Sequence, residues 1–522
     1  MPFAEIVRRQ GRARPGHLAL RWTGGGDEGE LTYLELDERT NRLATALAAE
    51  GIGPRDRVAI LDLNHRAHLE LVFATSKLGA VPVPVNFRLA AHEILDVVND
   101  SQARVLLVGQ PYAELVDGIA GELKHVTRRV DLGGDIYSGH YEDWLAAHPA
   151  DDPGYAAAPT ETAYQFYSSG TTGRPKGVEL SAAAMDSFID IFPRDYRVDG
   201  DSVNVVSLPL FHMGGNGVTF ATFREGGTNI ILRAFEPPGF VDLLAGRRCT
   251  HAGLVPAQIQ MMLAVPGVRD RDFSALRCVP YGGSPITETV LAAALSTFGC
   301  DFVQGYGLTE CAGGVTTLSA ADHDPQGPHT HRLRSVGVPN AGAEIRIVDP
   351  VTREDAPVGE VGEIWIRTVQ VMKGYWGRPE LTAETLVDGW LRSGDAGYFD
   401  ADGYLYLHDR IKDMIITGGE NVYSAEIENV LAAHPDVADC AVVAAPSERW
   451  GETPLAVVVR RAGAAASISE DDLIAFCRDR LAAFKCPTRV EWVDELPRNP
   501  TGKVLKWQLR DRYATHPSGR TS

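Results

Sequence analysis

Short apolar segments rich in β-branched residues alternate with stretches of helical periodicity from about residue 30 to residue 310. We predict strands at residues 57–61, 203–208 and 228–232, and a helix from Ser181 to Phe192, where a Ser N-cap precedes apolar residues at helical spacing. Strands that alternate with helices in this way favour parallel sheets flanked by helices. From Ser335 to Arg367 the pattern changes to short strands with Gly and Pro turns, which indicates a small β-rich subdomain.

The alternation starts again after the segment Asp409 to Lys412. The elements predicted there are helices at residues 424–433 and 470–481 and strands near residues 441–443, 456–459 and 490–493. About 110 residues suffice for a compact domain. We therefore predict the α/β class, with a large N-terminal domain (residues 1–411) of helix-flanked mixed or parallel sheets that includes the β-rich subdomain. A small α+β domain (residues 413–522) follows it.

Length and charge narrow the class of protein. A chain of 522 residues exceeds one ordinary hydrophobic core, and its 44% hydrophobic and 23% charged residues are typical of folded globular proteins. The formal net charge of −19 argues against a nucleic-acid partner, because phosphate backbones attract clustered Lys and Arg. It permits an anionic substrate, since a few local cations dominate at short range.

The cysteines and the first residues of the chain indicate the cellular compartment in which the protein is expected. The 7 cysteines lie far apart without a C-x-x-C pair, which is typical of buried thiols in a reducing compartment rather than of disulfides or a zinc site. The first residues lack the pattern of a secretory signal, and no apolar run approaches the ~18 residues of a transmembrane helix. We expect a cytoplasmic protein with no transmembrane segment.

The segment from Tyr167 to Gly177 (YSSGTTGRPKG) has the residue types of a phosphate-binding loop. Its glycines let backbone N–H groups converge on an anion, its hydroxyls donate to phosphate oxygens, and Lys176 adds positive charge. It is not a Walker A loop, because Pro175 stands where that motif needs Gly and no Ser or Thr follows the Lys. A solvated polar loop is the alternative.

Three further segments suit a nucleotide. In the segment from Tyr281 to Pro285, glycines let a flat ring approach the backbone, although a plain strand-to-helix turn has the same composition. The segment from Gln304 to Glu310 places an aromatic ring between two glycines, and Thr and Glu at a strand end, where ligands bind in open α/β sheets. In the alternative interpretation, Tyr306 is an aromatic residue of the core and Glu310 is a solvated residue at the start of a helix. Asp395 could accept two hydrogen bonds from a ribose diol or form a surface ion pair.

These segments, in this order, resemble the signature motifs of the AMP-forming acyl-CoA synthetase superfamily, which also contains luciferases and the adenylation domains of peptide synthetases. The resemblance covers about residues 30–510 and is closest in motif pattern to bacterial fatty-acid–CoA ligases. It implies ATP, Mg²⁺ and coenzyme A as cofactors. The residues that it assigns to the nucleotide are Ser168, Ser169, Gly170, Thr171, Thr172, Gly173, Lys176, Gly283, Ser284, Pro285, Gly305, Tyr306, Gly307, Thr309, Asp395 and Arg410.

The resemblance also implies catalytic roles. Thr172 and Glu310 serve the phosphates and Mg²⁺, which is usually held by one or two carboxylates together with substrate phosphates. Lys503, on a Pro/Gly turn, is the catalytic lysine that bridges the substrate carboxylate, the α-phosphate and the ribose side. Lys412 is the hinge of a mobile C-terminal domain, which rotates between an adenylating pose and a thiol-accepting pose. In the second pose the loop that contains Gly418, Gly419 and Glu420 replaces Lys503 and leaves room for the pantetheine arm.

The segment from Pro209 to Gly215 is the predicted acyl site. The resemblance directs His212 toward the substrate carboxylate, and a structural histidine at a strand end is the alternative. Small residues cluster after this segment and again near Glu310, and neither cluster contains Lys or Arg. Those predicted to line the pocket are Gly214, Gly215, Gly307, Ala312 and Gly313. We therefore expect a roomy apolar channel for a medium- or long-chain fatty acid or another bulky hydrophobic acid. His323, His329 and His331 could be mistaken for a metal cluster, and we predict that all three are solvated.

The predicted function is an acyl-CoA synthetase that forms acyl-AMP, releases pyrophosphate and passes the acyl group to CoA. The first alternative is an adenylating ligase that loads a carrier protein. Its amino-acid-activating members place an Asp next to the pocket Phe, where this chain has His212 after Phe211. The second is a non-catalytic nucleotide-binding member, against which the retention of Glu310 and Lys503 argues. The sequence leaves open the acid, the base for the thiol and the oligomeric state, for which a homodimer is one option.

Overall fold

The computed structural model describes residues 1–23, 28–133, 140–168, 175–284, 286–410, 415–417, 420–447, 450–461, 468–498 and 504–514. The chain divides into two compact units, Met1–Ile345 with Ile366–Leu391, and Arg346–Trp365 with Arg392–Ser522. Within the described ranges, no helix has both the length and the apolar character to cross a membrane. The predicted hinge at Lys412 lies outside these ranges, so the division at that residue stays a prediction.

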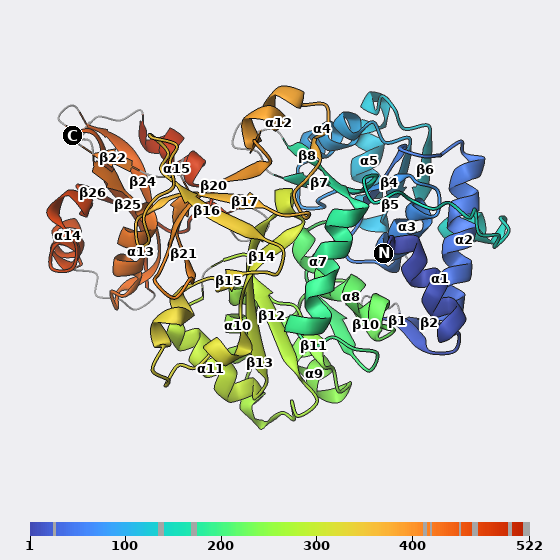
Figure 1. Ribbon diagram of the computed structural model, residues 1–522, viewed down its shortest axis with the longest axis horizontal. Coiled ribbons are helices and arrows are strands. Elements are labelled where there is room, and N and C mark those ends of the chain that lie inside the picture. The colour runs from blue at the N-terminus through green and yellow to red at the C-terminus, as the bar shows by residue number, and fades with distance from the viewer. Residues whose placement is uncertain are drawn as a thin grey trace. The chain divides into compact units, whose positions relative to one another are not determined.

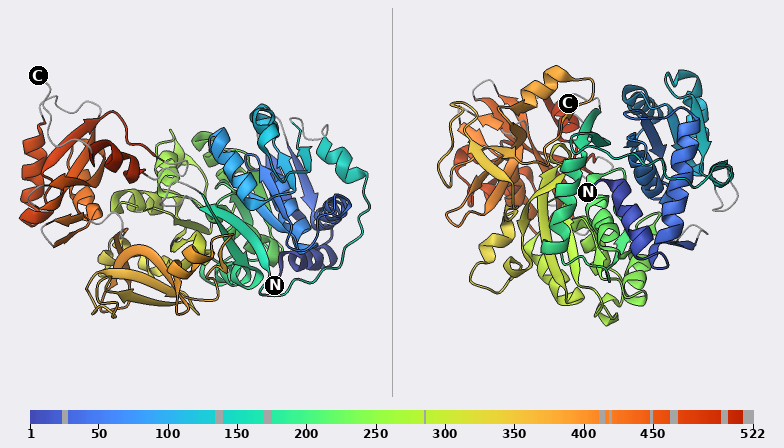
Figure 2. Two further views of the ribbon diagram at one scale, coloured as in Figure 1. Left: turned by 90° about the horizontal axis from the view of Figure 1, so that it is seen from above. Right: turned by 45° about the vertical axis from the view of Figure 1, so that its right-hand side comes forward.

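A parallel sheet of four strands, in the order β4-β3-β5-β6, belongs to the first unit (Figure 1). Alternate side chains of a strand face opposite sides of a sheet. Val58 and Ile60 therefore pack with α2, α3 and α6, whereas Ala59 and Leu61 pack with α4 and α5, so helices cover both faces (Figure 2). The elements are β3 (Arg57–Leu61), β4 (Val81–Pro84), β5 (Val105–Val108), β6 (Arg128–Asp131), α2 (Tyr33–Ala49), α3 (Arg66–Ser76), α4 (Ala91–Ser101), α5 (Ala113–Ile119) and α6 (His140–Ala146).

A 9-stranded sheet, in the order β15-β14-β13-β12-β11-β9-β10-β1-β2, forms the other large layer of this unit (Figure 1). The strands from β13 to β1 run parallel, and β14, β15 and β2 add antiparallel edges. The strands are β1 (Leu18–Thr23), β2 (Gly29–Thr32), β9 (Val203–Val206), β10 (Thr228–Leu232), β11 (His251–Ala252), β12 (Cys278–Gly282), β13 (Asp301–Leu308), β14 (Gly313–Leu318) and β15 (Val338–Pro339). Because parallel strands share one direction, the segments that follow β9, β12 and β13 all leave the sheet on the side of the carboxyl ends of the strands.

Helices cover this sheet with a continuous apolar core. Phe240, Ile259 and Phe298, from α9 (Pro237–Gly246), α10 (Pro256–Leu263) and α11 (Glu288–Phe298), pack with the buried strand residues Val279 and Phe302. The predicted strand at residues 228–232 is confirmed. The strand predicted at residues 203–208 ends earlier, at Val206. After Val206 the chain leaves the sheet and continues to Pro209, and a proline has no N–H that could donate a hydrogen bond to a neighbouring strand.

The second unit contains the predicted α+β arrangement. Its 5-stranded sheet has the order β23-β22-β25-β24, with β26 beside β25. Ala456 and Val458 of β25 pack with α13 and α14, while Leu455 and Val457 pack with α15. The elements are β22 (Ile415–Thr417), β23 (Glu420–Val422), β24 (Val437–Ser447), β25 (Gly451–Arg460), β26 (Arg489–Val493), α13 (Ser424–Ala432), α14 (Glu470–Arg478) and α15 (Lys506–Ala514).

Short strands occur in the region from Ser335 to Arg367, as predicted, but the sheet that they form continues to Arg410. A further 5-stranded sheet has the order β16-β17-β20-β19, with β21 beside β20. The boundary between the two units crosses strands of this sheet. Its members are β16 (Glu344–Val348), β17 (Gly362–Arg367), β19 (Leu386–Val387), β20 (Trp390–Phe399) and β21 (Leu405–Arg410).

Candidate active site

The predicted phosphate loop connects the two strands of an antiparallel hairpin. β7 (Thr162–Ser168) ends and β8 (Lys176–Ser181) begins at the register pair Ser168 and Lys176, so both residues stand at the same end of the hairpin. The short strand β18 (Gly374–Tyr375) pairs with the other edge of β8. The loop residues predicted to bind ATP, namely Ser169, Gly170, Thr171, Thr172 and Gly173, lie outside the described residues.

Glu310 lies beside this end of the hairpin. It belongs to η5 (Thr309–Cys311), a 3-10 turn directly after β13. Its Oε1 accepts hydrogen bonds from the hydroxyl of Ser168 at 3.1 Å and from the hydroxyl of Tyr375 at 3.0 Å. No residue within the described ranges donates a hydrogen bond to its Oε2. The structure thus brings the predicted residues Ser168 and Glu310 together with Tyr375, which the sequence did not single out.

Tyr375 also lies close to the second strand of the hairpin. The ammonium of Lys176 is 5.3 Å from the centroid of the Tyr375 ring, within the range of a cation–π contact. Burial and the neighbouring Glu310 carboxylate raise the pKa of Tyr375 well above its usual value. Its hydroxyl therefore stays protonated and serves as a donor.

A polar network that the sequence did not indicate anchors the hairpin to the N-terminal sheet. The carboxylate of Asp100 accepts hydrogen bonds at 2.8 Å from the Tyr167 hydroxyl and from Arg378. The guanidinium of Arg57 lies 3.4 Å from the centroid of the Trp376 ring. These contacts join α4 and β3 to β7 and to the residues after β18, at the end of the strand trio β7-β8-β18 where the phosphate loop begins.

The predicted adenine segments lie at the ends of two neighbouring strands. Gly282 and Gly305 are register partners, and a Cβ atom on Gly282 would lie 2.4 Å from the Gly305 carbonyl oxygen. Gly283 has a φ of +81°, a left-handed conformation that favours glycine, and Ser284 is exposed beside it. Tyr306 is 8% exposed, so most of its surface is covered by protein. Its predicted stacking on adenine stays a prediction.

The small residues predicted to line the acyl channel have two kinds of surroundings. A Cβ atom would lie 2.5 Å from a backbone oxygen at Gly215, 1.6 Å from one at Gly307, and 2.5 Å from a phenylalanine ring atom at Gly313. These three glycines therefore permit close approach of chain segments, and Ala312 is fully buried. Gly214 differs, because its added Cβ would find its nearest neighbour at 3.6 Å. A side chain at Gly214 would thus make an ordinary van der Waals contact instead of a clash, and lining of an acyl channel stays a prediction for all five residues.

His212 stands on a loop that two buried asparagines hold. The Asn64 side chain accepts a hydrogen bond from the Leu210 N–H at 2.9 Å, and the Asn216 side chain donates one to the His212 carbonyl oxygen at 2.6 Å. The His212 ring keeps contact with solvent, yet the protein around it lowers its pKa, and the cation of Arg88 lowers this pKa further. Both effects favour the neutral imidazole.

The prediction that His323 is solvated is wrong. Its side chain is buried, with Nε2 at 2.9 Å from the Tyr281 hydroxyl and Nδ1 at 2.7 Å from the Ser319 carbonyl oxygen. Two polar partners let the ring enter the interior in its neutral form, and burial lowers its pKa. His329 and His331 are exposed, as predicted. In the part of the chain that the structure describes, no group of His, Cys, Asp and Glu has the arrangement of a metal cluster.

The two predicted ribose contacts face each other in the second unit. Asp395 on β20 and Arg410 on β21 are register partners in an antiparallel pair, and only the backbone is described for Arg410. Side chains that start opposite each other in this way can reach a common ligand. The remaining predicted residues outside the described part are Pro285, Lys412, Gly418, Gly419 and Lys503, and for Glu420 the backbone alone is described.

Comparison with known families gives a match over most of the chain. The family model of the AMP-binding enzyme matches residues 7–376, and that of the AMP-binding enzyme C-terminal domain matches residues 426–503. The chain belongs to the AMP-binding enzyme family. Relatives named as ligases of CoA and of a carrier protein, together with this match, make it an AMP-forming acid–thiol ligase.

Two relatives and one solved structure illustrate the similarity. This AMP-binding enzyme is 42% identical over 490 residues to the fatty acid–[acyl-carrier-protein] ligase ScoC of Streptomyces coeruleorubidus, with 92% of each chain covered. It is 40% identical over 508 residues to a feruloyl-CoA synthase of Amycolatopsis sp., which covers 97% of this chain and 98% of the relative. The ATP-bound structure of MatB from Rhodopseudomonas palustris superimposes with a TM-score of 0.88 at 30% identity, over 98% of this chain and 99% of MatB.

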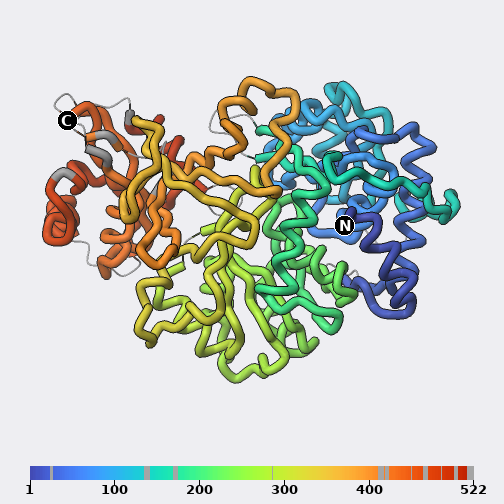
Figure 3. Tube along the Cα trace, in the orientation of Figure 1, coloured from blue at the N-terminus to red at the C-terminus, as the bar shows by residue number. Residues whose placement is uncertain are grey.

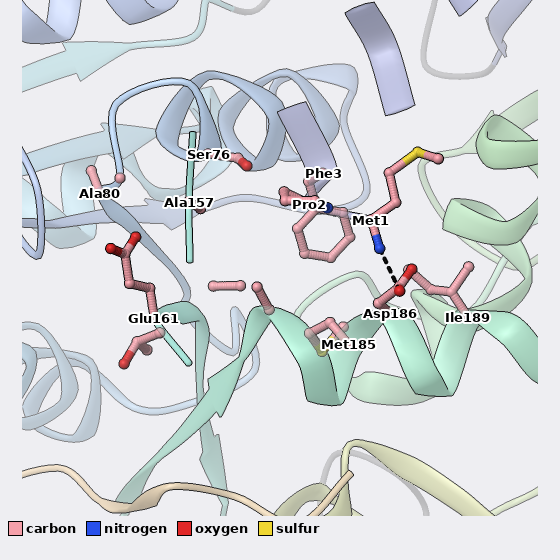
Figure 4. A pocket seen from close by; sticks show the side chains of 14 residues that line it. Met1, Pro2, Phe3, Ser76, Ala80, Ala157, Glu161, Met185, Asp186 and Ile189 are labelled. Atoms are coloured by element: carbon pink, nitrogen blue, oxygen red, sulfur yellow. Dashed lines mark ion pairs between the residues drawn. The ribbon is translucent and has the colours of Figure 1, made fainter. Parts of the chain in front are cut away.

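A cavity of this AMP-binding enzyme lies at the start of the chain, against α7 (Ala182–Asp195) (Figure 4). The N-terminal end of the chain trace is marked in Figure 3. The N-terminal ammonium of Met1 forms an ion pair with Asp186, and Phe3 and Met185 border the same space. Thr162, which also borders it, is the end of β7 opposite Ser168. No residue of the predicted active site lines this cavity, so we assign no substrate to it.

Proposed function

We propose that this AMP-binding enzyme joins a hydrophobic carboxylic acid to AMP, releases pyrophosphate and transfers the acyl group to coenzyme A. The observation that supports this best is the arrangement at the hairpin. Ser168 and Lys176 frame the glycine-rich loop, and Glu310 accepts a hydrogen bond from Ser168. A hydroxyl, a cation and a carboxylate at one end of such a loop suit a nucleoside triphosphate with a divalent cation.

In the first half-reaction a carboxylate oxygen of the acid attacks the α-phosphorus of ATP. The bond from that phosphorus to the bridging oxygen of the β-phosphate breaks, and pyrophosphate leaves. The phosphate loop and Lys176 bind the phosphates, Tyr306 and the segment after β12 bind adenine, and Asp395 with Arg410 binds the ribose. Lys503 supplies positive charge to the developing transition state.

Mg²⁺ fits the donor set of this site. Glu310 offers a carboxylate oxygen that no described residue engages, and the Thr172 hydroxyl belongs to the adjacent loop. One or two carboxylates together with substrate phosphates are the usual surroundings of protein-bound Mg²⁺. When bound there, the ion would neutralise phosphate charge, while Glu310 and Thr172 would hold it in place.

In the second half-reaction the sulfur of the acceptor thiol attacks the acyl carbon, the bond from that carbon to the AMP oxygen breaks, and AMP leaves. We place the hinge at Lys412 and the thiol-side loop at Gly418, Gly419 and Glu420. Coenzyme A is the proposed acceptor because relatives with CoA-ligase names are numerous among those found. A carrier protein is the second candidate, since ScoC is named as a ligase of that kind.

Nucleotide products test this function directly. The purified enzyme with magnesium-ATP should release pyrophosphate only when a suitable acid is present, and it should release AMP rapidly only after coenzyme A is added. Both products can be followed by coupled assays in the same reaction. Acid-independent release, or no acyl-adenylate with any lipophilic acid, would overturn the proposal. AMP release that needs a carrier protein instead of coenzyme A would favour the second candidate.

A panel of acids tests the apolar site. The Phe211 ring lies 5.6 Å from the His212 ring and 5.1 Å from the Phe87 ring, so an aromatic pair adjoins the predicted acid-facing histidine on one side. Each buried methylene contributes ~0.8 kcal/mol. We therefore expect octanoate to exceed malonate at least about tenfold in kcat/KM, measured as pyrophosphate release. A higher value for the short diacid would contradict the apolar site without affecting the adenylation chemistry.

A further inference from the structure

The carboxylate of Glu310 is held by a residue that no motif marks. Its Oε1 accepts two hydrogen bonds, from Ser168 of β7 and from Tyr375 of β18. Two donors on one oxygen fix the rotation of a carboxylate, because turning the group would break both bonds. The second oxygen then keeps a constant direction.

The main chain of Tyr375 is itself held by two contacts. Its backbone pairs with Val178 of β8, and its N–H donates to the Thr382 hydroxyl at 2.9 Å. Met372, three positions earlier in the chain, donates its N–H to the Glu310 carbonyl oxygen at 2.8 Å. The segment Met372–Tyr375 thus binds both the main-chain carbonyl and the side-chain carboxylate of Glu310.

The same aromatic ring links the two ends of the phosphate site. The Lys176 ammonium lies 5.3 Å from the Tyr375 ring centroid, while the hydroxyl at the far end of this ring reaches Glu310. A rigid ring therefore sets the separation between the cation at the start of β8 and the carboxylate after β13. A Phe at this position would keep the ring and lose the hydroxyl.

We propose that Tyr375 is a positioning residue for ATP activation, which holds Glu310 so that its Oε2 remains available to the magnesium–triphosphate complex. This inference rests on the proposed function of the site. The ordinary alternative is that the Tyr375 hydroxyl only satisfies a buried acceptor and adds stability. The two differ in whether the loss of the hydroxyl weakens the coupling between Mg²⁺ and ATP.

Tyr375→Phe separates these possibilities. We expect the concentration of Mg²⁺ that gives half the maximal pyrophosphate release to rise about tenfold, the scale of one hydrogen bond to a charged group. Calorimetry of ATP binding with Mg²⁺ and with EDTA should show a similar loss of the magnesium-dependent gain in affinity. Tyr33→Phe is the matched control, since the buried Tyr33 hydroxyl donates to the Gly227 carbonyl oxygen at 2.6 Å away from these residues. Equal behaviour of the two variants would overturn the inference.

A double-mutant cycle with Glu310→Gln shows whether Tyr375 acts through Glu310. If it does, Tyr375→Phe should change the rate by less than about twofold in the Glu310→Gln background, because coupled residues give non-additive effects. Full additivity would mean that Tyr375 acts elsewhere. A wild-type enzyme that forms no acyl-adenylate would instead refute the proposed function, so the two failures are distinguishable.

Discussion

Glu310→Gln is expected to slow acid-dependent pyrophosphate release by about 100-fold or more, the scale on which a preorganised charge or dipole contributes to a transition state. The amide oxygen of Gln can still accept the hydrogen bonds that Ser168 and Tyr375 donate to Oε1. The substitution therefore removes the negative charge and leaves the local packing in place. Initial rates at saturating ATP, measured over a range of Mg²⁺ concentrations, would show both the lower maximum and the higher Mg²⁺ requirement.

A matched substitution shows that the effect belongs to the site. Glu161 directly precedes β7, at the end opposite Ser168, and accepts a hydrogen bond from the Tyr155 hydroxyl at 2.9 Å. Glu161→Gln removes the same charge away from the site and should leave the rate within about twofold of the wild type, as is usual for substitutions away from a special feature. If Glu310→Gln also retained the wild-type rate, the proposed role of Glu310 would be refuted.

The elements that the sequence predicted best are those with a complete local signal. The strands at residues 57–61 and 228–232 coincide with β3 and β10, because a short run of β-branched and apolar residues determines a buried parallel strand. The extent of the predicted phosphate loop also follows from local composition, since glycines and hydroxyls that surround an anion are contiguous in the chain. Ser168 and Lys176 stand at one end of a hairpin, which was not predicted from the sequence, and phosphate binding by the loop between them stays a prediction.

The residues that the sequence missed act through distant contacts. Tyr375 reaches Glu310 across 65 positions, and Asn64 reaches Leu210 across 146 positions. Neither Tyr375 nor Asn64 lies in one of the motifs from which the site was predicted, so only the assembled sheets show what they hold. The signal that could have found Tyr375 is its place in a Gly-Tyr-Trp-Gly segment, where glycines on both sides of aromatic residues indicate close packing.

The local amino-acid composition did not predict correctly which glycines lie beside unoccupied space in the protein. Clustered glycines suggested a roomy channel, but Gly307 is small because a backbone oxygen occupies the position of its Cβ, and Gly313 because a phenylalanine ring does. The burial of His323 was likewise not predictable from local composition, because its ring is paired with the Tyr281 hydroxyl, 42 positions away in the chain. Small or polar residues report the local environment only after the neighbouring segments are known.

Lys503→Ala is expected to slow adenylation by about 100-fold or more, because its ammonium would neutralise charge that develops as pyrophosphate leaves. Lys503 lies outside the described residues, yet the residues on either side of its turn are placed. Arg498 and Val504 form a β-bridge, and the Leu505 N–H donates to the Pro497 carbonyl oxygen at 2.7 Å. The described residues before and after this segment are therefore held together within the second unit, so Ala at position 503 should leave the fold of that unit intact. Single-turnover formation of acyl-AMP measures the effect.

The two half-reactions give this prediction its control. If Lys503 serves only the adenylating pose, the variant should convert supplied acyl-AMP and coenzyme A to thioester at roughly the wild-type rate. Lys485→Ala provides the matched lysine, because its ammonium pairs with Glu426 at 2.8 Å in the same unit and has no proposed part in the chemistry. Unimpaired pyrophosphate release by Lys503→Ala would contradict the assignment. An equal loss of both half-reactions would contradict the exchange of poses, since a lysine that leaves the site after adenylation cannot limit the step that follows.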